Sequence, residues 1–484
     1  LTIDSSASLS MDSSTEYTLS VSKDWVNNGT FTRGIGIVSF VGNSYQEITG
    51  SSPTDFYYLK VDKVAQANIL EVNSIITLNA AANPLILTAG TFKLSSASTI
   101  APYTTAPSLS GLMGIWNNGG TINSGNFSWT LNPGLLRLSE GTINIGTASN
   151  NNITYLNSGK LIVEGGSLNV AGRISPNSAT SVGIFSQSAG IITVNKVGST
   201  STARAPFEIA ASANFTFTGG TIVIQKASSN ASDYLNLATT NLVSGGTLQI
   251  GNASTPTNQT IRINSTAPIY NLLVNSYNSP KGQLVSNNFI VKNDLTIAGG
   301  TFDANVLDIS IKGNWTNNGL FIPNVGKVSF DGSANQSITG ATTFYNVMLN
   351  NTAGLALANA VTINNNFSIL SGQVNLGSLT HSANSLTLGG SGTVSGTWGN
   401  TASSATNQNN TYFAATTGIV NVASCGAYWT GTQDTSWTNP NNWSSCGIPT
   451  NSSDVTINSG TFQPVIASNV SVNGLSIASG TSLT

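Results

Sequence analysis

Short runs of alternating apolar and polar residues follow one another along the whole chain. Typical runs cover residues 160–164, 221–225 and 247–250. Glycine, asparagine and serine flank these runs, which is the pattern of half-buried strands between tight turns. No segment combines a helix cap with three turns of an amphipathic helix. The pattern therefore predicts an all-β protein.

A five-residue phrase recurs within this pattern: glycine, threonine or a similar residue, an apolar residue, a polar residue and a second apolar residue. Copies begin at Gly90, Gly141, Gly166, Gly190, Gly220, Gly246 and Gly372. Successive copies are about 20 to 30 residues apart, or near multiples of that distance. This spacing fits one coil of a parallel β-solenoid, in which equivalent strands stack at ~4.8 Å. A string of β-sandwiches is the competing architecture, since it also has short strands and frequent turns.

We therefore expect an elongated, right-handed parallel β-solenoid over roughly the first 420 residues. Its interior should be an apolar ladder made from the alternating positions. The residues expected to face inward are Val38, Phe40, Ile48, Phe56, Leu161, Val163, Ile222, Ile224, Val328, Phe330 and Ile338.

The chain also contains duplicated units. Residues 23–50 align without gaps with residues 313–340, an offset of 290 (315 − 25), and fourteen of the twenty-eight positions are identical. Trp25 and Trp315 are among these positions. A third, partial copy covers residues 259–275 and is similar to residues near 336–350. Such repeats indicate stacked copies of one structural unit.

The domain organisation follows from the repeats and from one change in composition. Residues 1–424 form the predicted solenoid array, with related units near 23–98, 259–311 and 312–398. Residues 425–450 are rich in tryptophan and contain both cysteines, so we predict a small cap or junction there. Residues 451–484 return to the solenoid pattern and begin a further unit.

Charge is scarce in this sequence. Only 7% of the 484 residues are charged, against roughly 25% in an ordinary soluble domain. The net charge of −2 provides no long-range field for nucleic acid or an anionic membrane. No run of 18 or more apolar residues predicts a membrane span. The sequence lacks a signal peptide at its start and ends within a motif, so we interpret it as a mature or partial segment of a longer protein.

Cys425 and Cys446 are the only cysteines. Their spacing allows one short-loop disulfide, which would imply an oxidising location. The alternative is two unrelated small residues.

Several motifs resemble repeats in the very large secreted surface proteins of gliding, bacteroidete-type bacteria. The motifs cover residues 313–319, 328–332, 336–340 and 344–347, and residues 437–457 are similar to a junction module of the same proteins. The resemblance implies export by a type IX secretion route, an extracellular or cell-surface location, and adhesive or filament-forming roles connected with gliding or biofilms. It implies no catalytic residues and no cofactor.

Catalytic chemistry is the other possibility to consider, because parallel β-helices include polysaccharide lyases and hydrolases. Such enzymes need clustered carboxylates, with or without Ca²⁺, or a basic residue beside them. Asp303 and Asp308, with Asp294 upstream, come closest to a cluster. His381 is the only histidine and has no recognisable nucleophile context. One histidine and two distant cysteines do not form a usual zinc site. We expect no metal, no cofactor and no enzyme activity.

Aromatic residues are the other candidates for function. Trp429, Trp437, Trp443, Tyr57 and Tyr58 could stack on sugar rings. Alternatively, the tryptophans pack a small core. The favoured hypothesis is a non-enzymatic structural or adhesive surface protein whose partners are other segments of its own long chain, identical chains or a surface polysaccharide. The alternative is a β-helix that binds or cleaves polysaccharide.

Overall fold

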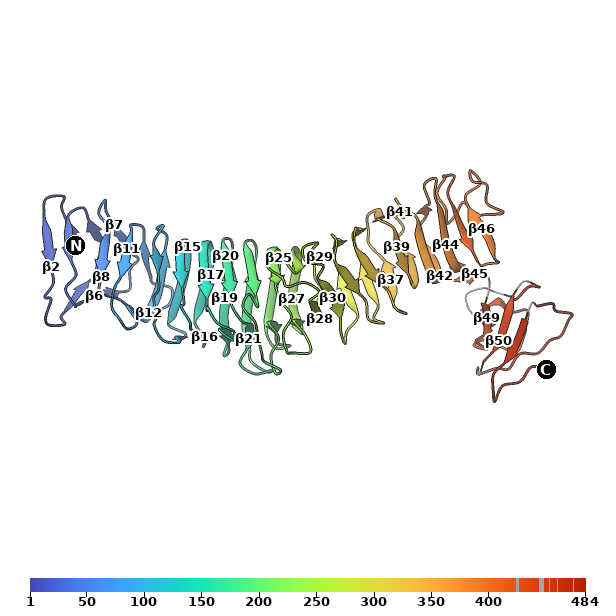
Figure 1. The fold of residues 1–484 in the computed structure, drawn as a ribbon, viewed down its shortest axis with the longest axis horizontal. Helices are drawn as coiled ribbons and strands as arrows, with labels where there is room; N and C mark the ends of the chain where they lie inside the picture. The colour runs from blue at the N-terminus through green and yellow to red at the C-terminus, as the bar shows by residue number, and fades with distance from the viewer. Residues whose placement is uncertain (424–425, 444–447, 452, 459, 473) are drawn as a thin grey trace. The chain divides into compact units, whose positions relative to one another are not determined.

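A computed structural model describes residues 1–423, 426–443, 448–451, 453–458, 460–472 and 474–484. The chain divides into two compact units. Unit 1 comprises residues 1–270 and 277–285, and unit 2 comprises residues 271–276 and 286–484. In both units most of the described strands pair in parallel with strands one coil further along the chain (Figure 1). Residues 391–392 and 396–399 of unit 2 pair antiparallel. The chain is therefore a parallel β-solenoid, of about 21 coils, as the sequence predicted.

Each coil of unit 1 contributes three strand segments, which stack into three faces. The first face contains the short strands β1 (Thr2–Ile3), β4 (Trp25–Asn27), β7 (Gln46–Thr49), β10 (Ile69–Val72), β19 (Gly159–Val163) and β22 (Gly183–Gln187). It also contains the C-terminal half of β12 (Leu85–Leu94) and the N-terminal halves of four long strands, β15 (Met113–Asn123), β17 (Leu135–Ile145), β25 (Asn214–Ile224) and β27 (Thr240–Ile250).

The second face includes the C-terminal halves of β15, β17, β25 and β27, since these long strands bend around a corner and pair on two faces. Its other strands are β2 (Ser8–Ser10), β5 (Thr30–Thr32), β8 (Thr54–Phe56), β11 (Ile76–Leu78), β13 (Thr99–Ile100), β20 (Ser167–Val170) and β23 (Ile191–Val194). The third face consists of β3 (Thr18–Val21), β6 (Ile37–Gly42), β9 (Tyr58–Lys63), the N-terminal half of β12, β14 (Ser108–Leu109), β16 (Trp129–Leu131), β18 (Ile153–Tyr155), β21 (Ile174–Pro176), β24 (Phe207–Ile209), β26 (Tyr234–Asn236), β28 (Thr260–Ser265) and β30 (Lys281–Leu284).

Unit 2 has the same coiled pattern, here with short strands. One row is β29 (Asn271–Val274), β32 (Leu295–Ile297), β35 (Trp315–Asn317), β38 (Gln336–Thr339), β41 (Leu355–Leu357) and β43 (Val374–Asn375). A second contains β33 (Thr301–Asp303), β36 (Leu320–Ile322) and β39 (Thr342–Phe344). The third contains β31 (Phe289–Val291), β34 (Ile309–Ile311), β37 (Lys327–Phe330), β40 (Asn346–Asn350), β42 (Val361–Ser371), β44 (Thr380–Leu388), β45 (Ser391–Gly392), β46 (Gly396–Gly399), β47 (Asn407–Gln408) and β48 (Ile419–Val422).

The last part of unit 2 contains a three-stranded parallel sheet of β49 (Gly426–Trp429), β50 (Asp454–Ile457) and β51 (Gly474–Ile477). A single 3-10 turn, η1 (Pro440–Asn442), lies between β49 and β50 in sequence, and Asn439 caps it. The described residues contain no α-helix. Cys425 and Cys446 lie outside the described residues, so their disulfide remains a prediction.

The solenoid interior is apolar, and the sequence predicted its members correctly. All eleven residues expected to face inward are buried, with at most 4% of their surface exposed. They recur at every second position of their strands, because successive side chains of a strand point to opposite faces. In-register stacking then places each inward residue above its equivalent in the previous coil.

The duplicated units share one internal arrangement. Trp25 and Trp315 are both fully buried. Each indole Nε1 donates to a threonine hydroxyl of the next coil, Thr54 at 3.3 Å and Thr342 at 3.2 Å. Each ring also makes an edge contact with a phenylalanine, with centroids 4.9 Å apart in one unit and 4.7 Å in the other. The equivalence of Trp25 and Trp315 predicted from the repeat is confirmed.

Candidate functional site

Charged side chains gather on the outward side of the first face of unit 1. Strand register places Glu47, Glu71, Lys93, Trp116 and Arg137 in one row, one residue from each of five consecutive coils. Asp24 extends the row by one coil, and its Oδ1 accepts the backbone N–H of Glu47 at 3.0 Å. We call these six residues the charged row. Further along, the row continues with the uncharged Ile162 and Ser186.

The acidic end of the charged row is held by neutral hydrogen-bond donors. The Tyr45 hydroxyl lies 2.5 Å from Glu71 Oε2 and 3.0 Å from Glu47 Oε1. The side-chain amide of Asn73 donates to Glu47 at 2.9 Å, and the Ser95 hydroxyl donates to Glu71 at 2.6 Å. These donors come from neighbouring coils, so the network ties successive coils together.

The central part of the row is a cation–π arrangement around Trp116. Lys93 and Arg137 belong to the coils on either side of Trp116. The Lys93 ammonium lies 4.2 Å from the centre of the indole, and the Arg137 guanidinium carbon lies 3.9 Å from it. At partly exposed sites each such contact contributes about 0.5–1 kcal/mol. The indole itself donates to Ser139 at 2.8 Å.

Both cations of the row are paired with carboxylates. Lys93 lies 2.8 Å from Glu71. Arg137 forms a two-pronged pair with Glu164, at 2.9 and 3.0 Å. Burial by itself would raise the pKa of Glu71, but hydrogen bonds from Lys93, Ser95 and Tyr45 outweigh it and hold this pKa below its usual range. Glu164 behaves alike: burial is offset by Arg137 and Ser139, and its pKa is lowered.

Two grooves border the charged row. A polar groove of about 440 Å³ runs over the stacked corners beside Asn73 and Ser95. It is lined mainly by serines and main chain. A smaller groove of about 190 Å³ lies on the other side, between Gln66, Thr91, Trp116 and Arg137, with Ala67, Ile69 and Leu135 also lining it. The smaller groove therefore combines an apolar lining with polar groups, which is the composition typical of small-ligand sites.

The charged row was not predicted from the sequence. Its members are separated by 21 to 24 residues (137 − 116 and 71 − 47), so no local motif connects them. The coil register connects them, and a one-residue error in register would turn each side chain to the opposite side of the sheet. Aligning the phrases that begin at Gly90 and Gly141 would have misplaced Lys93, because Asn144 of the second phrase lies on the second face and Lys93 lies on the first.

Tyr57 and Tyr58, predicted as possible glycan contacts, lie where β8 passes into β9. Their rings meet edge to face with centroids 5.0 Å apart. Arg33 lies 5.4 Å from the centre of the Tyr57 ring and pairs with Asp55 at 2.9 Å. Both tyrosines are half-buried. Glycan contact at this place remains a prediction.

Trp429, Trp437 and Trp443, the other predicted glycan contacts, form a compact core with Val455 and Ile457. Trp443 meets the other two rings edge to face, at 4.9 Å from Trp429 and 4.6 Å from Trp437. No more than 5% of any of the three is exposed. The packing alternative therefore describes the observed arrangement. Glycan contact through these rings would require the core to open.

The residues considered for catalysis serve local structure. Asp294 Oδ1 accepts the Asn314 N–H at 2.7 Å, and Asp308 Oδ1 accepts the Lys327 N–H at 2.9 Å. Asp303 is buried and accepts from Asn305 and Asn324. His381 is also buried, with Nδ1 accepting from Val361 and Nε2 bonded to the Leu376 carbonyl. Within the described ranges, no three histidine, cysteine or acidic side chains are placed to hold a metal ion.

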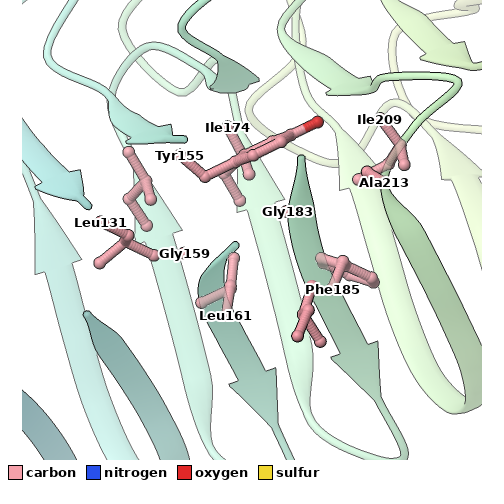
Figure 2. A pocket seen from close by; sticks show the side chains of 11 residues that line it. Leu131, Tyr155, Gly159, Leu161, Ile174, Gly183, Phe185, Ile209 and Ala213 are labelled. Carbon is pink, nitrogen blue, oxygen red and sulfur yellow. The ribbon is translucent and has the colours of Figure 1, made fainter. Parts of the chain in front are cut away.

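An enclosed apolar cavity lies inside unit 1 (Figure 2). Its lining includes Leu131, Leu161, Ile174, Phe185 and the ring of Tyr155. The Tyr155 hydroxyl donates to the Glu208 carbonyl at 3.1 Å and accepts the Ala210 N–H at 3.0 Å. The cavity volume of about 10 Å³ corresponds to about one water molecule. It is a packing defect and too small for a ligand.

Comparisons with known proteins add one match. Residues 428–484 match the model of a domain of unknown function, DUF8693. This segment contains the three-tryptophan core and most of the β49–β51 sheet. No curated protein and no solved structure matches the chain. No helix in the part of the chain that the structure describes has the length and apolar character needed to cross a membrane.

Proposed function

We propose that this chain is part of a non-enzymatic, extracellular structural and adhesive protein, exported to the cell surface by a type IX route. The observation that carries the proposal is the use of charged groups between coils. Ion pairs such as Arg33–Asp55, Lys93–Glu71, Arg137–Glu164 and Arg262–Asp233 each join residues of neighbouring coils. The hydrogen bonds from Trp25 to Thr54 and from Trp315 to Thr342 also join neighbouring coils.

This arrangement suits a stiff shaft better than a catalytic groove. Catalytic acids and bases need a proton that can reach the substrate, and a pKa matched to the reaction. The carboxylates considered above accept main-chain or side-chain donors, and His381 is enclosed by main chain. The motif resemblance to giant surface proteins of gliding bacteria supports the exterior location and the adhesive or filament role.

Binding of polysaccharide is the second candidate function. The groove of about 190 Å³ beside Trp116 favours it, because aromatic, apolar and hydrogen-bonding groups meet there. Binding and cleavage are separable, and the charged row favours binding because its carboxylates are held by fixed donors.

The test combines an activity assay with localisation. The purified chain is incubated with neutral and acidic polysaccharides, and reducing ends and unsaturated products are measured. We expect neither product, and we expect antibodies against the chain to label intact cells that produce it. Product release that is abolished by Asp303→Asn or Asp308→Asn would replace the proposal with an enzyme. Labelling only after cell lysis would contradict the exterior location.

A further inference from the structure

The smaller groove beside the charged row has features of a site for a short stretch of polysaccharide. Its apolar lining comes from Ala67, Ile69 and Leu135, and its polar groups come from Gln66, Thr91 and Arg137. Gly114 pairs with both Thr91 and Leu135 on the adjacent coils. Because Gly114 has no side chain, the Thr91 side chain lies against its backbone and fills the place that a Cβ would take.

The groove also presents hydrogen-bonding groups that the protein leaves available. Arg137 uses Nε and Nη2 for Glu164, and its Nη1 has no hydrogen-bond partner among the described residues. Gln66 uses its amide nitrogen for the carbonyls of Gly111 and Met113 at 3.3 and 2.8 Å. Its side-chain oxygen likewise has no partner within the described part of the chain. A donor and an acceptor therefore line the same groove, and neighbouring sugar hydroxyls require such a combination.

The charge balance selects among glycans. Each cation at the groove is already paired, Lys93 with Glu71 and Arg137 with Glu164. The two pairs neutralise Lys93 and Arg137, and Lys160, beside Leu135 in the next coil, adds a single positive charge near the groove. The pairs also keep the Arg137 side chain in place before a ligand arrives, which lowers the entropy cost of binding.

We propose that the groove between Gln66, Trp116 and Arg137 binds a short stretch of a neutral polysaccharide. Ile69 and Leu135 stand three coils apart in register, about 14 Å at ~4.8 Å per coil. They therefore pack on different rings of the stretch, whose hydroxyls bond to Arg137 Nη1 and Gln66 Oε1. The inference deepens the adhesive function proposed above and rests on it for its biological role. Further rings of the same polysaccharide extend past the edge of Trp116.

Two variants test the site without removing its ion pairs. Ala67 is exposed, so Ala67→Leu fills the groove without loading the core. Arg137→Lys keeps a cation for Glu164 but removes the free guanidinium donors. Arg33→Lys is the matched control, since Arg33 also pairs with an acid at 2.9 Å and lies over an aromatic ring, on Tyr57.

The experiment measures retention of the purified chain by soluble glucan, mannan and xylan in affinity electrophoresis, with alginate as the acidic comparison. We expect retention by at least one neutral polysaccharide, affinity reduced about tenfold or more in Ala67→Leu and Arg137→Lys, and Arg33→Lys within about twofold of the wild type. Thermal unfolding of each variant checks its fold.

Four results would overturn the inference: no retention of the wild type by any neutral polysaccharide, retention by alginate alone, equal losses in Arg33→Lys and Arg137→Lys, or no loss in either groove variant. Equal losses of affinity in Arg33→Lys and Arg137→Lys would place the binding site at Tyr57. If self-association of the chain at higher concentration accounts for the retardation, the surface binds a second copy of the chain. These results leave the exterior location untouched, whereas glycan cleavage would refute the proposed function and not the binding site.

Discussion

Lys63 and Asn351 occupy the same hydrogen-bonding position in the two duplicated units, although they stand at different places in the aligned sequences. The Lys63 ammonium donates to the Ser44 carbonyl at 3.0 Å and to the side-chain oxygen of Gln46. The Asn351 amide donates to the Ala334 carbonyl at 2.7 Å and to the side-chain oxygen of Gln336 at 3.0 Å. The two acceptor pairs differ by the repeat offset of 290 (336 − 46). A charged group thus replaces a neutral one at an equivalent corner.

This replacement should make the stability of unit 1 depend on pH. Burial lowers the pKa of Lys63 from 10.5 to about 8, against an opposing effect of the Asp24 charge. Between about pH 8 and 10.5 the unfolded chain therefore binds more protons at this residue than the folded chain. The free energy of unfolding contributed by Lys63 should rise with pH across that window.

The measurement is the difference in unfolding free energy between the wild type and Lys63→Met, taken at several pH values from 7 to 10 by guanidinium unfolding. We expect the difference to shift in favour of the wild type as the pH rises. Lys23→Met, which removes an exposed ammonium group, is the control. A difference that stays constant or moves the other way would contradict the assigned burial of Lys63.

A second prediction concerns the threonine beneath each buried tryptophan. The Thr342 hydroxyl accepts from Trp315 Nε1 at 3.2 Å and from the Asn317 amide at 3.1 Å. Thr342→Val keeps the shape but leaves buried donors without this acceptor, so it should lower the unfolding free energy by about 1–3 kcal/mol. Thr54→Val should have a similar effect in unit 1, because Trp25 and Asn27 use Thr54 in the same way.

The matched control for this prediction is Thr342→Ser, which keeps the hydroxyl and should cost less than the valine variant. Guanidinium unfolding followed by tryptophan fluorescence measures both. If serine and valine are equally destabilising, the methyl packing and not the hydrogen bond supports Trp315.

The solenoid interior could be predicted from sequence because it depends on local alternation. Ile48, Ile338 and Phe330 each stand at an apolar position between polar neighbours, and glycine spacing gives the coil length. The charged row depends on register between coils. The spacing within the row varies from 21 residues (Trp116 to Arg137) to 24 residues (Glu47 to Glu71), so a fixed period does not align its members.

The tryptophan core near the C-terminus shows a different limit. Trp429, Trp437 and Trp443 are close in sequence, and aromatic residues of this density are compatible with both a sugar site and a core. The residues that pack against the tryptophans decide whether the rings form a core or a sugar site. Here Val455 and Ile457 of β50 complete the core, and a single sequence gives no direct signal for that pairing.

A third prediction tests the register of the ladder in unit 2. Phe330 is fully buried, and its ring lies 6.4 Å from that of Phe344. Phe330→Asp places an unpaired charge in this interior and should lower the unfolding free energy by about 4 kcal/mol or more. Leu320→Asp is the control, because Leu320 is 55% exposed and the change there should cost little. An unchanged melting temperature for Phe330→Asp would show that the register is wrong.

The last prediction concerns the stability of unit 2 at acidic pH. His381, the only histidine, is buried, and its Nδ1 lies 3.2 Å from the Val361 nitrogen as the acceptor of that N–H. Nε2 lies 3.1 Å from the Leu376 carbonyl and therefore carries the hydrogen in the neutral ring. A second proton on Nδ1 would face the Val361 N–H. Burial lowers the pKa of His381 below 6.5, while the Leu376 hydrogen bond acts in the opposite direction.

As the pH falls below about 6.5 the unfolded chain takes up a proton before the folded chain does, so unit 2 should lose stability. His381→Gln can both accept and donate but does not titrate in this range. The difference in unfolding free energy between the wild type and His381→Gln should therefore decrease from pH 7.5 to pH 5, while carboxylates titrate equally in both proteins. A difference that is independent of pH would mean that His381 is as accessible to protons in the folded state as in the unfolded chain.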